Sequence, residues 1–557
     1  MNRIALPAAL LSLLAATATG QWASQQSARI APSPNDLAVG DEFGRAIDIE
    51  GSTLVVGAHG YDPVGGAPND GAVWIWTLGS GGWTQGAQLL STTHSGDQFG
   101  HSVSLSGDTL AIGAPFESFS SMSKPGAVYV FTRNAGVWSL EARLVAGDFA
   151  PVDRFGWSVA LEGDTLAVGA PNDDHPGGLD HGSAYVFTRT SGVWTQQAKL
   201  LASDGATSDL FGSSIALSGD RVLVGAPQKD GPGISNRGSA YLFERAGATW
   251  SEVVKFEPAD GAASDKFGTA VALDADTAAI GAPGNDAAGL EAGAAYVYFG
   301  ASGAWSLQQK LTDSGVIFVD LFGSALALEG DRLVVGLPGN NVPSTGAGAA
   351  QFFTRAGSTW VGHFDMIGSE TSFIDRLGSA VAISGDFVAA GAPDAEEFAG
   401  SERQGEAYVF EITAPPLIES YCTAKTNSLG CAPQMGWTGT PSVSNPSPFE
   451  VLCTQVLNFK QGLLFYGYAP SAAPFQGGLL CVAPPLRRTP LRNSLGSATP
   501  TNDCSGHYEF DMNAHVQAGT DANLVAGAHV YCQYWMRDPQ SPSTTGLSDG
   551  VHFQLEP

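Results

Sequence analysis

Acidic and histidine side chains gather in segments rich in Gly, Asn and Pro, and these are the residues best suited to bind a cation or a polar ligand. The segment 172–181 is the richest of them, with Asp173, Asp174, His175, Asp180 and His181. Carboxylates and imidazoles at such short spacing can coordinate a divalent ion. We take this segment as a candidate binding loop, with Asp173, Asp174 and Asp180 as its candidate metal ligands. A solvated polar loop is the alternative.

Later segments of the same composition place polar residues at corresponding positions. The further candidate binding residues are Lys229, Asp230, Asn285, Asp286, Asn340, Asn341, Asp394, Glu396 and Glu397. The chain contains no nucleophile elbow, zinc-protease helix motif, phosphate loop or dinucleotide fingerprint. We therefore expect no catalytic residues, no enzyme activity and no cofactor, with Ca²⁺ as the ion that these oxygens would suit best.

The candidate segments belong to a repeat that recurs seven times at intervals of 55 or 56 residues. Each copy begins with Phe-Gly, or with Leu-Gly in the last, at positions 43, 99, 155, 211, 267, 322 and 377. So regular a period over most of a chain indicates a repeat architecture. Two short apolar runs around a Gly-Asp turn predict a β-hairpin, and two further runs follow the variable segment. Each copy therefore contains four short antiparallel strands, as does one blade of a β-propeller.

The ends of the repeat region predict a closed ring. The seventh copy stops after its third strand, at 407–411, and the missing fourth-strand pattern is found near the N-terminus, at 22–30. We expect this N-terminal segment to complete the last blade, which would remove an open sheet edge. The prediction is an all-β chain with a seven-bladed β-propeller over residues 21–413.

Two further positions recur in the copies. A Trp begins each fourth strand, and we expect it to pack between neighbouring blades because large aromatic side chains dominate β cores. An Asp stands two residues before each Phe-Gly or Leu-Gly pair, where its side chain can accept a hydrogen bond from a nearby backbone N–H. A cation site is the alternative for these Asp residues.

The Phe-Gly and Gly-Ala-Pro units resemble FG-GAP repeats, the blades of the integrin α-subunit propeller and of many secreted bacterial proteins. The resemblance implies a propeller that binds extracellular partners. Several integrin blades carry an acidic calcium loop between their first and second strands. Here that connection is only a short turn such as Ser106-Gly107-Asp108. It offers too few oxygens for Ca²⁺, which takes six to eight, so the family's calcium sites are not carried over.

Strand polarity predicts which face of the ring meets a partner. The turns between strands 1 and 2 and between strands 3 and 4 lie on one face and are short. The loops between strands 2 and 3, and from strand 4 to the next blade, lie on the opposite face and are long and variable. Binding residues concentrate on variable loops held by a rigid scaffold. We expect this second face, called the loop face below, to be the recognition surface.

Charge and targeting signals limit the possible partners and the location. The net charge is −28, and most of it lies in the repeat region, which argues against binding to nucleic acid or anionic membranes. Residues 1–20 have the basic, apolar and small-residue regions of a secretory signal. No later stretch is long and apolar enough to span a membrane. We expect a secreted or cell-surface protein, present as a monomer.

A Pro-containing linker, 414–420, is expected to precede a second domain over 421–557. All six cysteines fall there, namely Cys422, Cys431, Cys453, Cys481, Cys504 and Cys532. In an exported chain this number allows up to three disulfides in fifteen pairings, of which we favour a local Cys422–Cys431 bond. Alternating apolar runs predict a small β-sandwich. His507, Glu509 and Asp511 match no metal or nucleophile pattern.

Three functions remain open from the sequence. The first is an exported protein that recognises a protein or a glycan through the loop face of the propeller. The second is an extracellular hydrolase or lyase with its site at the propeller axis. The third is a structural spacer at the cell surface. Polar residues converging on the axis would favour the enzyme, and a broad aromatic and acidic loop face would favour recognition.

Overall fold

The computed structural model describes residues 22–557 except 33–36, 39, 64–67, 92–95, 120, 176–177, 302–303, 314–318, 396–403, 414–417, 422–423, 477, 496–502, 520 and 556–557. The expected signal segment and the candidate residues Glu396 and Glu397 lie outside the described residues. The chain divides into a unit over Ala23–Thr413 and a C-terminal unit that begins at Ala414. Within the described ranges, no helix is long and apolar enough to cross a membrane.

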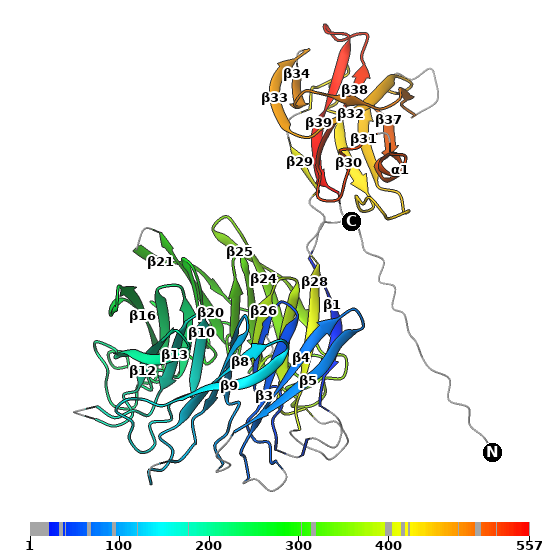
Figure 1. The fold of residues 1–557 in the computed structure, drawn as a ribbon. Coiled ribbons are helices and arrows are strands. Elements are labelled where there is room, and N and C mark those ends of the chain that lie inside the picture. Colours follow the sequence, from blue (N-terminus) through cyan, green and yellow to red (C-terminus); the bar gives the residue numbers. More distant parts are fainter. Residues whose placement is uncertain are drawn as a thin grey trace, which may run out of the picture. The chain divides into compact units, whose positions relative to one another are not determined.

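Seven four-stranded antiparallel sheets form the first unit (Figure 1). Blades 1 to 4 are β2–β5 (Ala46–Glu50, Thr53–Ala58, Ala72–Gly79, Gly82–Leu90), β6–β9 (Ser102–Ser106, Thr109–Ala114, Ala127–Asn134, Val137–Leu144), β10–β13 (Ser158–Glu162, Thr165–Ala170, Ser183–Thr190, Val193–Leu200) and β14–β17 (Ser214–Ser218, Arg221–Ala226, Ser239–Ala246, Thr249–Phe256). Blades 5 to 7 are β18–β21 (Val271–Asp274, Thr277–Ala282, Ala294–Ala301, Ala304–Leu311), β22–β25 (Leu326–Glu329, Arg332–Leu337, Ala349–Ala356, Thr359–Met366), and β26–β28 (Ala380–Ser384, Phe387–Ala392, Glu406–Thr413) with β1 (Ala23–Ile30).

The first strand of each blade lies innermost. Each first strand contacts the first strand of the next blade, and β2 contacts β26, so the contacts run round a closed ring. The second strands are buried along nearly their whole length because the sheets pack face to face around the axis. The expectation of a seven-bladed β-propeller is confirmed.

The N-terminal strand closes the ring as expected. Strand β1 pairs antiparallel with β28, from Ala23 opposite Thr413 to Ile30 opposite Ala407. The seventh sheet therefore has the order β1-β28-β27-β26, with its outer strand supplied by the opposite end of the repeat region. This pairing covers the sheet edge that β28 would otherwise expose.

The Phe-Gly pair joins neighbouring blades. Its first residue is buried in every blade, including the Leu377 variant. Phe99 forms a backbone bridge to Gly71, which precedes the third strand of blade 1. The following Gly has a positive φ; at Gly44 (φ +92°) a Cβ atom would lie 2.2 Å from the carbonyl oxygen of Glu406. Only glycine fits there, which explains why the pair recurs.

The Trp side chains at the start of the fourth strands contact the preceding blade. Trp194 Nε1 donates a hydrogen bond to Glu141 Oε2 at 3.0 Å, and Arg189 lies over the Trp194 ring at 5.2 Å. Trp250 and Trp360 donate in the same way to the preceding blade's outer strand. For these three residues, packing between blades is confirmed.

The short turns between first and second strands form a ring of hydrogen bonds. In each blade the residue before the turn accepts a hydrogen bond from a backbone N–H of the next blade's turn, at donor–acceptor distances of 2.5 to 3.2 Å. The acceptors are Glu50, Ser106, Glu162, Ser218, Asp274, Glu329 and Ser384. The last of them binds the N–H of Gly51 in blade 1. These polar side chains therefore satisfy one backbone N–H of each turn and link every blade to the next.

The C-terminal unit consists of sheets packed about two clusters of buried side chains, one of them much larger than the other. Strands β29 (Ile418–Tyr421), β39 (Thr545–Gln554), β38 (His529–Arg537), β32 (Gln461–Gly467) and β35 (Arg487–Arg488) form one sheet, which β36 (Arg492–Asn493) joins at β32. Strands β30 (Gln434–Thr438), β31 (Glu450–Val456) and β37 (Gly506–Asp511) form a second sheet, and β33 (Pro470–Phe475) pairs with β34 (Gly478–Val482). Residues of β31, β32, β37, β38, β39 and helix α1 (Met512–Gln517) share a core, as expected for a β-sandwich.

The favoured local disulfide is wrong. Cys431 is bonded to Cys504, 73 residues away, and not to Cys422. Cys481 is also disulfide-bonded, while Cys422 lies outside the described residues. Cys453 and Cys532 are buried free thiols in the core. Short sequence spacing misled the prediction because Cys431 lies in the loop before β30, which packs against the segment leading into β37.

Candidate functional site

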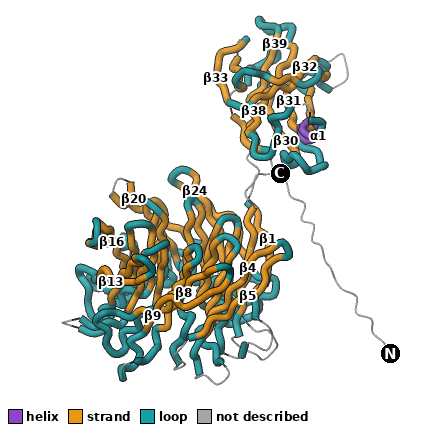
Figure 2. Tube along the Cα trace, in the orientation of Figure 1, coloured by secondary structure: helices purple, strands orange, loops and turns teal. Residues whose placement is uncertain are grey.

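The loops between second and third strands, and those between blades, lie together on one end of the propeller, as antiparallel order requires. Figure 2 shows the longer loops gathered at that end. A ligand approaching along the axis from this side would meet the starts of the first strands. The loop face therefore contains both the predicted binding residues and the entrance to the ring.

Four of the predicted binding residues are buried and support the loops from within. Asp173 is 5% exposed, accepts a hydrogen bond from Tyr185 Oη at 2.7 Å and pairs with Lys199 Nζ at 2.7 Å. Lys229, Asn285 and Asn340 are also buried, and Lys229 Nζ lies 2.9 Å from Asp209 Oδ2. These side chains make contacts inside the protein and cannot reach a partner. Only the exposed residues beside them can form the proposed contact surface.

The exposed predicted residues close the loops on which they stand. Asp174, Asp230 and Asp286 accept hydrogen bonds from the backbone N–H groups of Asp180, Asn236 and Glu291, at 2.7 to 2.8 Å. One carboxylate oxygen of each therefore holds the loop in a fixed shape.

The remaining predicted residues pair locally. The rings of His175 and His181 stack with centroids 5.5 Å apart. Asp180 accepts a hydrogen bond from Asn172 Nδ2 at 2.8 Å, and Asp394 pairs with Arg376 at 3.2 Å. Across the described residues, no three His, Cys, Asp or Glu side chains are arranged to hold a metal ion.

The Asp that precedes each Phe-Gly or Leu-Gly pair is buried in all seven blades. In five of them a carboxylate oxygen accepts the backbone N–H of the residue three positions earlier, so the turn interpretation holds for these residues. Burial raises the pKa of Asp41 to about 6 and that of Asp153 to about 7, against the lowering effect of these hydrogen bonds.

A second acidic position joins the third and fourth strands to the loop face. Asp148 accepts hydrogen bonds from Tyr185 Oη at 3.0 Å and Lys199 Nζ at 2.6 Å. Burial acts to raise the pKa of Asp148, but the bonds from Lys199 and Tyr185 outweigh it and the pKa lies below its ordinary value. Blades 4 and 5 repeat this Tyr–Asp–Lys cluster around Asp204 and Asp260. The recurring acids therefore stabilise the blades.

The blades differ most at the residues that flank the Phe-Gly pair. The residue after the pair is Arg45, His101 or Trp157 in blades 1 to 3 and Ser or Thr in blades 4 to 7. The residue before the pair has a positive φ of 54° to 58° in all seven blades although none is glycine. Side chains held in this sparsely populated backbone region often mark functional sites.

Several of these flanking residues line one cavity on the loop face, which we call the mouth cavity. Its volume is about 770 Å³. The lining residues are Arg45, Val319, Leu321, Ser324, Pro338, Gly339, Asn341, Thr345, Gly346, Ile374, Arg376 and Ser379. They come from blades 1, 6 and 7, so the residues that follow the Phe-Gly or Leu-Gly pair converge at the entrance to the ring.

Aromatic and basic side chains cluster beside the axis in blades 1 to 3. The rings of His101 and Trp157 have centroids 4.4 Å apart, and the Arg154 guanidinium lies over Trp157 and Phe116 at 5.5 and 5.1 Å. Burial, together with the smaller effects of the nearby His59, Arg45 and Arg154, lowers the pKa of His101 to about 3. Burial and Arg45 likewise lower the pKa of His59 to about 4. Both imidazoles are neutral at physiological pH.

Sequence reasoning missed these flanking residues. The sequence prediction rested on acidic residues in the loops. The informative signal was instead a position that varies within an otherwise uniform repeat. Arg45, His101 and Trp157 stand where four other copies have Ser or Thr. Comparing the copies column by column would have found the position.

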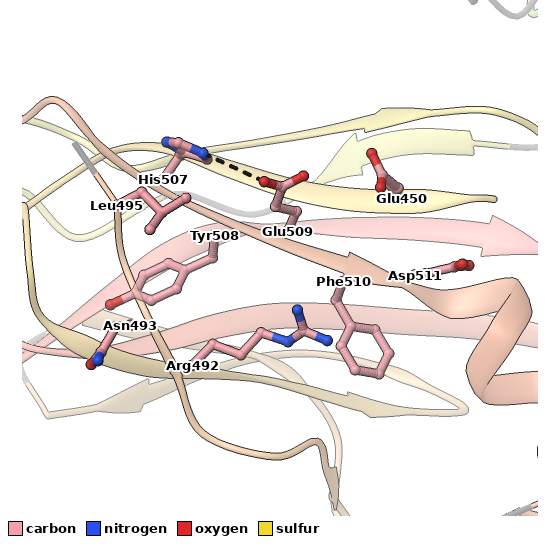
Figure 3. A pocket seen from close by; sticks show the side chains of 9 residues that line it. All are labelled: Glu450, Arg492, Asn493, Leu495, His507, Tyr508, Glu509, Phe510 and Asp511. Carbon is pink, nitrogen blue, oxygen red and sulfur yellow. Dashed lines mark ion pairs between the residues drawn. The ribbon is translucent and has the colours of Figure 1, made fainter.

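The C-terminal unit has a separate surface cavity of about 400 Å³ (Figure 3). Its lining includes Glu450, Arg492, His507, Glu509 and Asp511. His507 Nε2 lies 3.5 Å from Glu509 Oε1, and Arg492 stacks over Phe510 at 5.4 Å. The charged groups are mixed in sign, with three carboxylates, an arginine and a histidine, so the cavity does not present one sign of charge to a ligand.

Two known proteins resemble parts of this chain. Integrin alpha-3 from Cricetulus griseus is 31% identical over 168 residues, which are 26% of this chain and 15% of that protein. The chain thus matches only a small part of the integrin's length. A chain in the crystal structure of the mitotic checkpoint complex aligns over 74% of this chain and 99% of its own length at 14% identity. Its TM-score of 0.40 is too low to support an inference.

The sequence model of the FG-GAP repeat matches seven segments, which together make up well over half of the chain. The matched segments are 25–76, 83–131, 138–187, 194–243, 250–298, 305–353 and 360–410. Each segment spans the outer strand of one blade and the first three strands of the next, so the seven segments together cover the whole ring. The chain therefore belongs to the FG-GAP repeat family.

Proposed function

We propose that this protein is an extracellular binding protein that captures a partner on the loop face of its propeller. The observation that carries the proposal is the mouth cavity, which opens among variable side chains on a rigid seven-bladed scaffold. Binding sites favour such concave positions over a fixed framework. The similarity to an integrin α-subunit supports an extracellular binding role of this kind.

Binding is favoured over catalysis by the hydroxyl groups of the cavity. Ser324 Oγ and Ser379 Oγ donate hydrogen bonds to the backbone carbonyls of Leu321 and Arg376. A nucleophilic serine would instead donate to a general base. We therefore propose a recognition protein that is secreted or retained at the cell surface.

Blocking one face of the propeller at a time with a bulky label tests which face binds a partner. Ser235, in the loop between β15 and β16 on the loop face, and Ser52, in the turn between β2 and β3 on the opposite face, are both exposed. Ser235→Cys and Ser52→Cys variants of the full chain would each be biotinylated at the new thiol and loaded with streptavidin. Capture of partners from arrays of extracellular proteins and glycans would then be compared.

Streptavidin at residue 235 is expected to lower capture at least tenfold, while the same label at residue 52 leaves capture unchanged. The Ser52→Cys protein is a matched control because the substitution and the label are identical. Equal capture by both labelled proteins would exclude the loop face as the recognition surface.

A further inference from the structure

We infer that the mouth cavity binds the carboxylate of an acidic side chain on a protein partner, flanked by apolar residues. This inference rests on the proposed function and names the chemistry of its ligand. It begins from the local charge. The chain as a whole is strongly acidic, at −28, whereas the residues that line the cavity include two arginines and no carboxylate.

Arg45 is the centre of the proposed site. It is exposed, lines the cavity, and within the described residues its guanidinium has no carboxylate partner. Nearly every other arginine of the propeller is paired, as Arg133 is with Asp108 and Arg189 with Asp164. An unpaired guanidinium presents a planar fork of N–H donors that matches a carboxylate.

Arg376 supplies the second positive charge from blade 7. Its Nε lies 3.2 Å from Asp394 Oδ2, yet its side chain is 53% exposed, so much of the guanidinium still faces solvent. Arg154 and Lys266 occupy the equivalent position in blades 3 and 5. Among the described residues, the nearby carboxylates include Asp394 and Glu42, and Glu42 lies 3.7 Å from His59. Asp320 and Asp375 adjoin Leu321 and Arg376 in the sequence but are buried. The side chains that line the cavity itself therefore contribute two positive charges and no negative one.

The walls of the cavity favour a peptide over a saccharide. Val319 and Ile374 are 41% and 39% exposed, and Leu321 and Pro338 lie beside them. Such aliphatic walls suit Val-, Leu- or Ile-like side chains next to the carboxylate. Saccharides favour a flat aromatic surface, and the nearest candidate, Trp157, is covered by Arg154 and His101.

Nucleic acid is disfavoured by the same charge distribution. A polyphosphate chain would extend beyond the cavity over a propeller whose acidic residues outnumber its basic ones. The repulsion grows with each added phosphate. A single carboxylate can enter the cavity without bringing further negative charge near the acidic surface.

Matched peptides test the chemistry on the full chain. The probes are a blocked valine–glutamate–valine tripeptide, its glutamine counterpart, and glucuronate as an acidic saccharide, each titrated by calorimetry or NMR. The glutamate peptide is expected to bind at least tenfold more tightly than the glutamine peptide and than glucuronate. Equal binding of the two peptides, or no binding of either, would overturn the inference, and tighter binding of glucuronate would overturn the choice of a protein partner.

Substitutions locate the site. Arg45→Gln is expected to weaken binding of the glutamate peptide at least tenfold, and Arg45→Lys to restore part of it. Arg133→Gln, at the opposite face, is the control and should leave binding unchanged. Thermal melts should match wild type for Arg45→Gln because Arg45 has no described ion pair.

The two proposals fail in different ways. If streptavidin at residue 235 blocks capture of a partner but Arg45→Gln binds that partner and the peptide as wild type does, the loop face remains the recognition surface and only the carboxylate assignment is wrong. If occlusion at residue 235 has no effect, the proposed function itself is wrong.

Discussion

At the scale of single residues, Asp48 is a carboxylate at a position where the other copies of the repeat have none. The equivalent residue is Ser104 in blade 2 and Ala in the other five blades. Asp48 accepts hydrogen bonds from the backbone N–H groups of Leu105, at 2.7 Å, and Ile49, at 2.8 Å. Burial raises the pKa of its carboxyl group from 3.8 to about 7, against the lowering effect of these two bonds. The folded chain therefore holds a proton there that the unfolded chain releases.

This raised pKa predicts a pH-dependent effect of Asp48→Asn. Between pH 4 and pH 7 the folded state binds more protons than the unfolded state, so the Asp48 contribution to stability falls as the pH rises through that window. The variant cannot titrate. Its stability relative to wild type should therefore increase from pH 4 to pH 8, by ~1–4 kcal/mol.

Chemical denaturation of both proteins at several pH values measures this difference. Ser104→Ala is the control, because Ser104 Oγ accepts the equivalent N–H, from Leu161, but does not titrate. A stability difference between Asp48→Asn and wild type that stays constant from pH 4 to pH 8 would contradict the prediction.

At the scale of elements, an ion pair fastens the closing strand. Arg29 on β1 bonds through Nε to Glu406 Oε2 on β28 at 2.8 Å, and the Glu406 side chain is only 4% exposed. Tyr408 Oη donates to the same oxygen at 2.7 Å. The bond to Glu406 raises the pKa of Arg29, and partial burial opposes the increase. The interaction matters because removing one partner leaves a charge in a buried position.

Arg29→Ala should destabilise the propeller by about 2–4 kcal/mol, since Glu406 would lose its cation while remaining buried. Arg133→Ala should cost about 1 kcal/mol or less, because its partner Asp108 is 69% exposed and surface ion pairs contribute little. Urea titration of both variants checks the difference. A double variant with Glu406→Gln should recover part of the loss. Equal losses of stability in the two single variants would show that the Arg29–Glu406 ion pair contributes no more than an ion pair at the surface.

The sequence predicts regular elements well and long-range pairings poorly. The blades and the closing strand follow from local periodicity and from one unmatched strand pattern, 22–30. The disulfide could not be deduced, because Cys431 and Cys504 become neighbours only through the packing of the C-terminal unit. The mouth cavity was missed for the same reason, since Arg45 and Arg376 stand far apart in the sequence. Acidic loop residues such as Asp173 are conspicuous in the sequence but buried in the structure.

At the scale of the whole molecule, the chain consists of two compact units with separate cores. The propeller core is divided among clusters between its blades, whereas the largest cluster of the C-terminal unit joins residues from both of its larger sheets. The Cys431–Cys504 bond lies wholly within the C-terminal unit. Removing this disulfide should therefore lower the stability of the C-terminal unit and leave that of the propeller unchanged.

A Cys431→Ser/Cys504→Ser variant tests this independence. Removing a cross-link across 73 residues should destabilise the C-terminal unit by about 2–5 kcal/mol, mainly because the unfolded chain gains freedom. Calorimetry should show one transition moved to lower temperature and the propeller transition unchanged. That unchanged transition is the internal control. A single transition that moves as a whole would mean that the units unfold together.

The pairing of β1 with β28 also sets the order of events during biosynthesis. Ala23 pairs with Thr413, so strand β1, which precedes every blade in the chain, finds its partner only after the third strand of the last blade has been synthesised. Contacts so distant in sequence form late and leave intermediates exposed. Synthesis therefore has to complete both ends of the repeat region before the ring can close, and premature termination inside the last blade would leave the protein open at that junction.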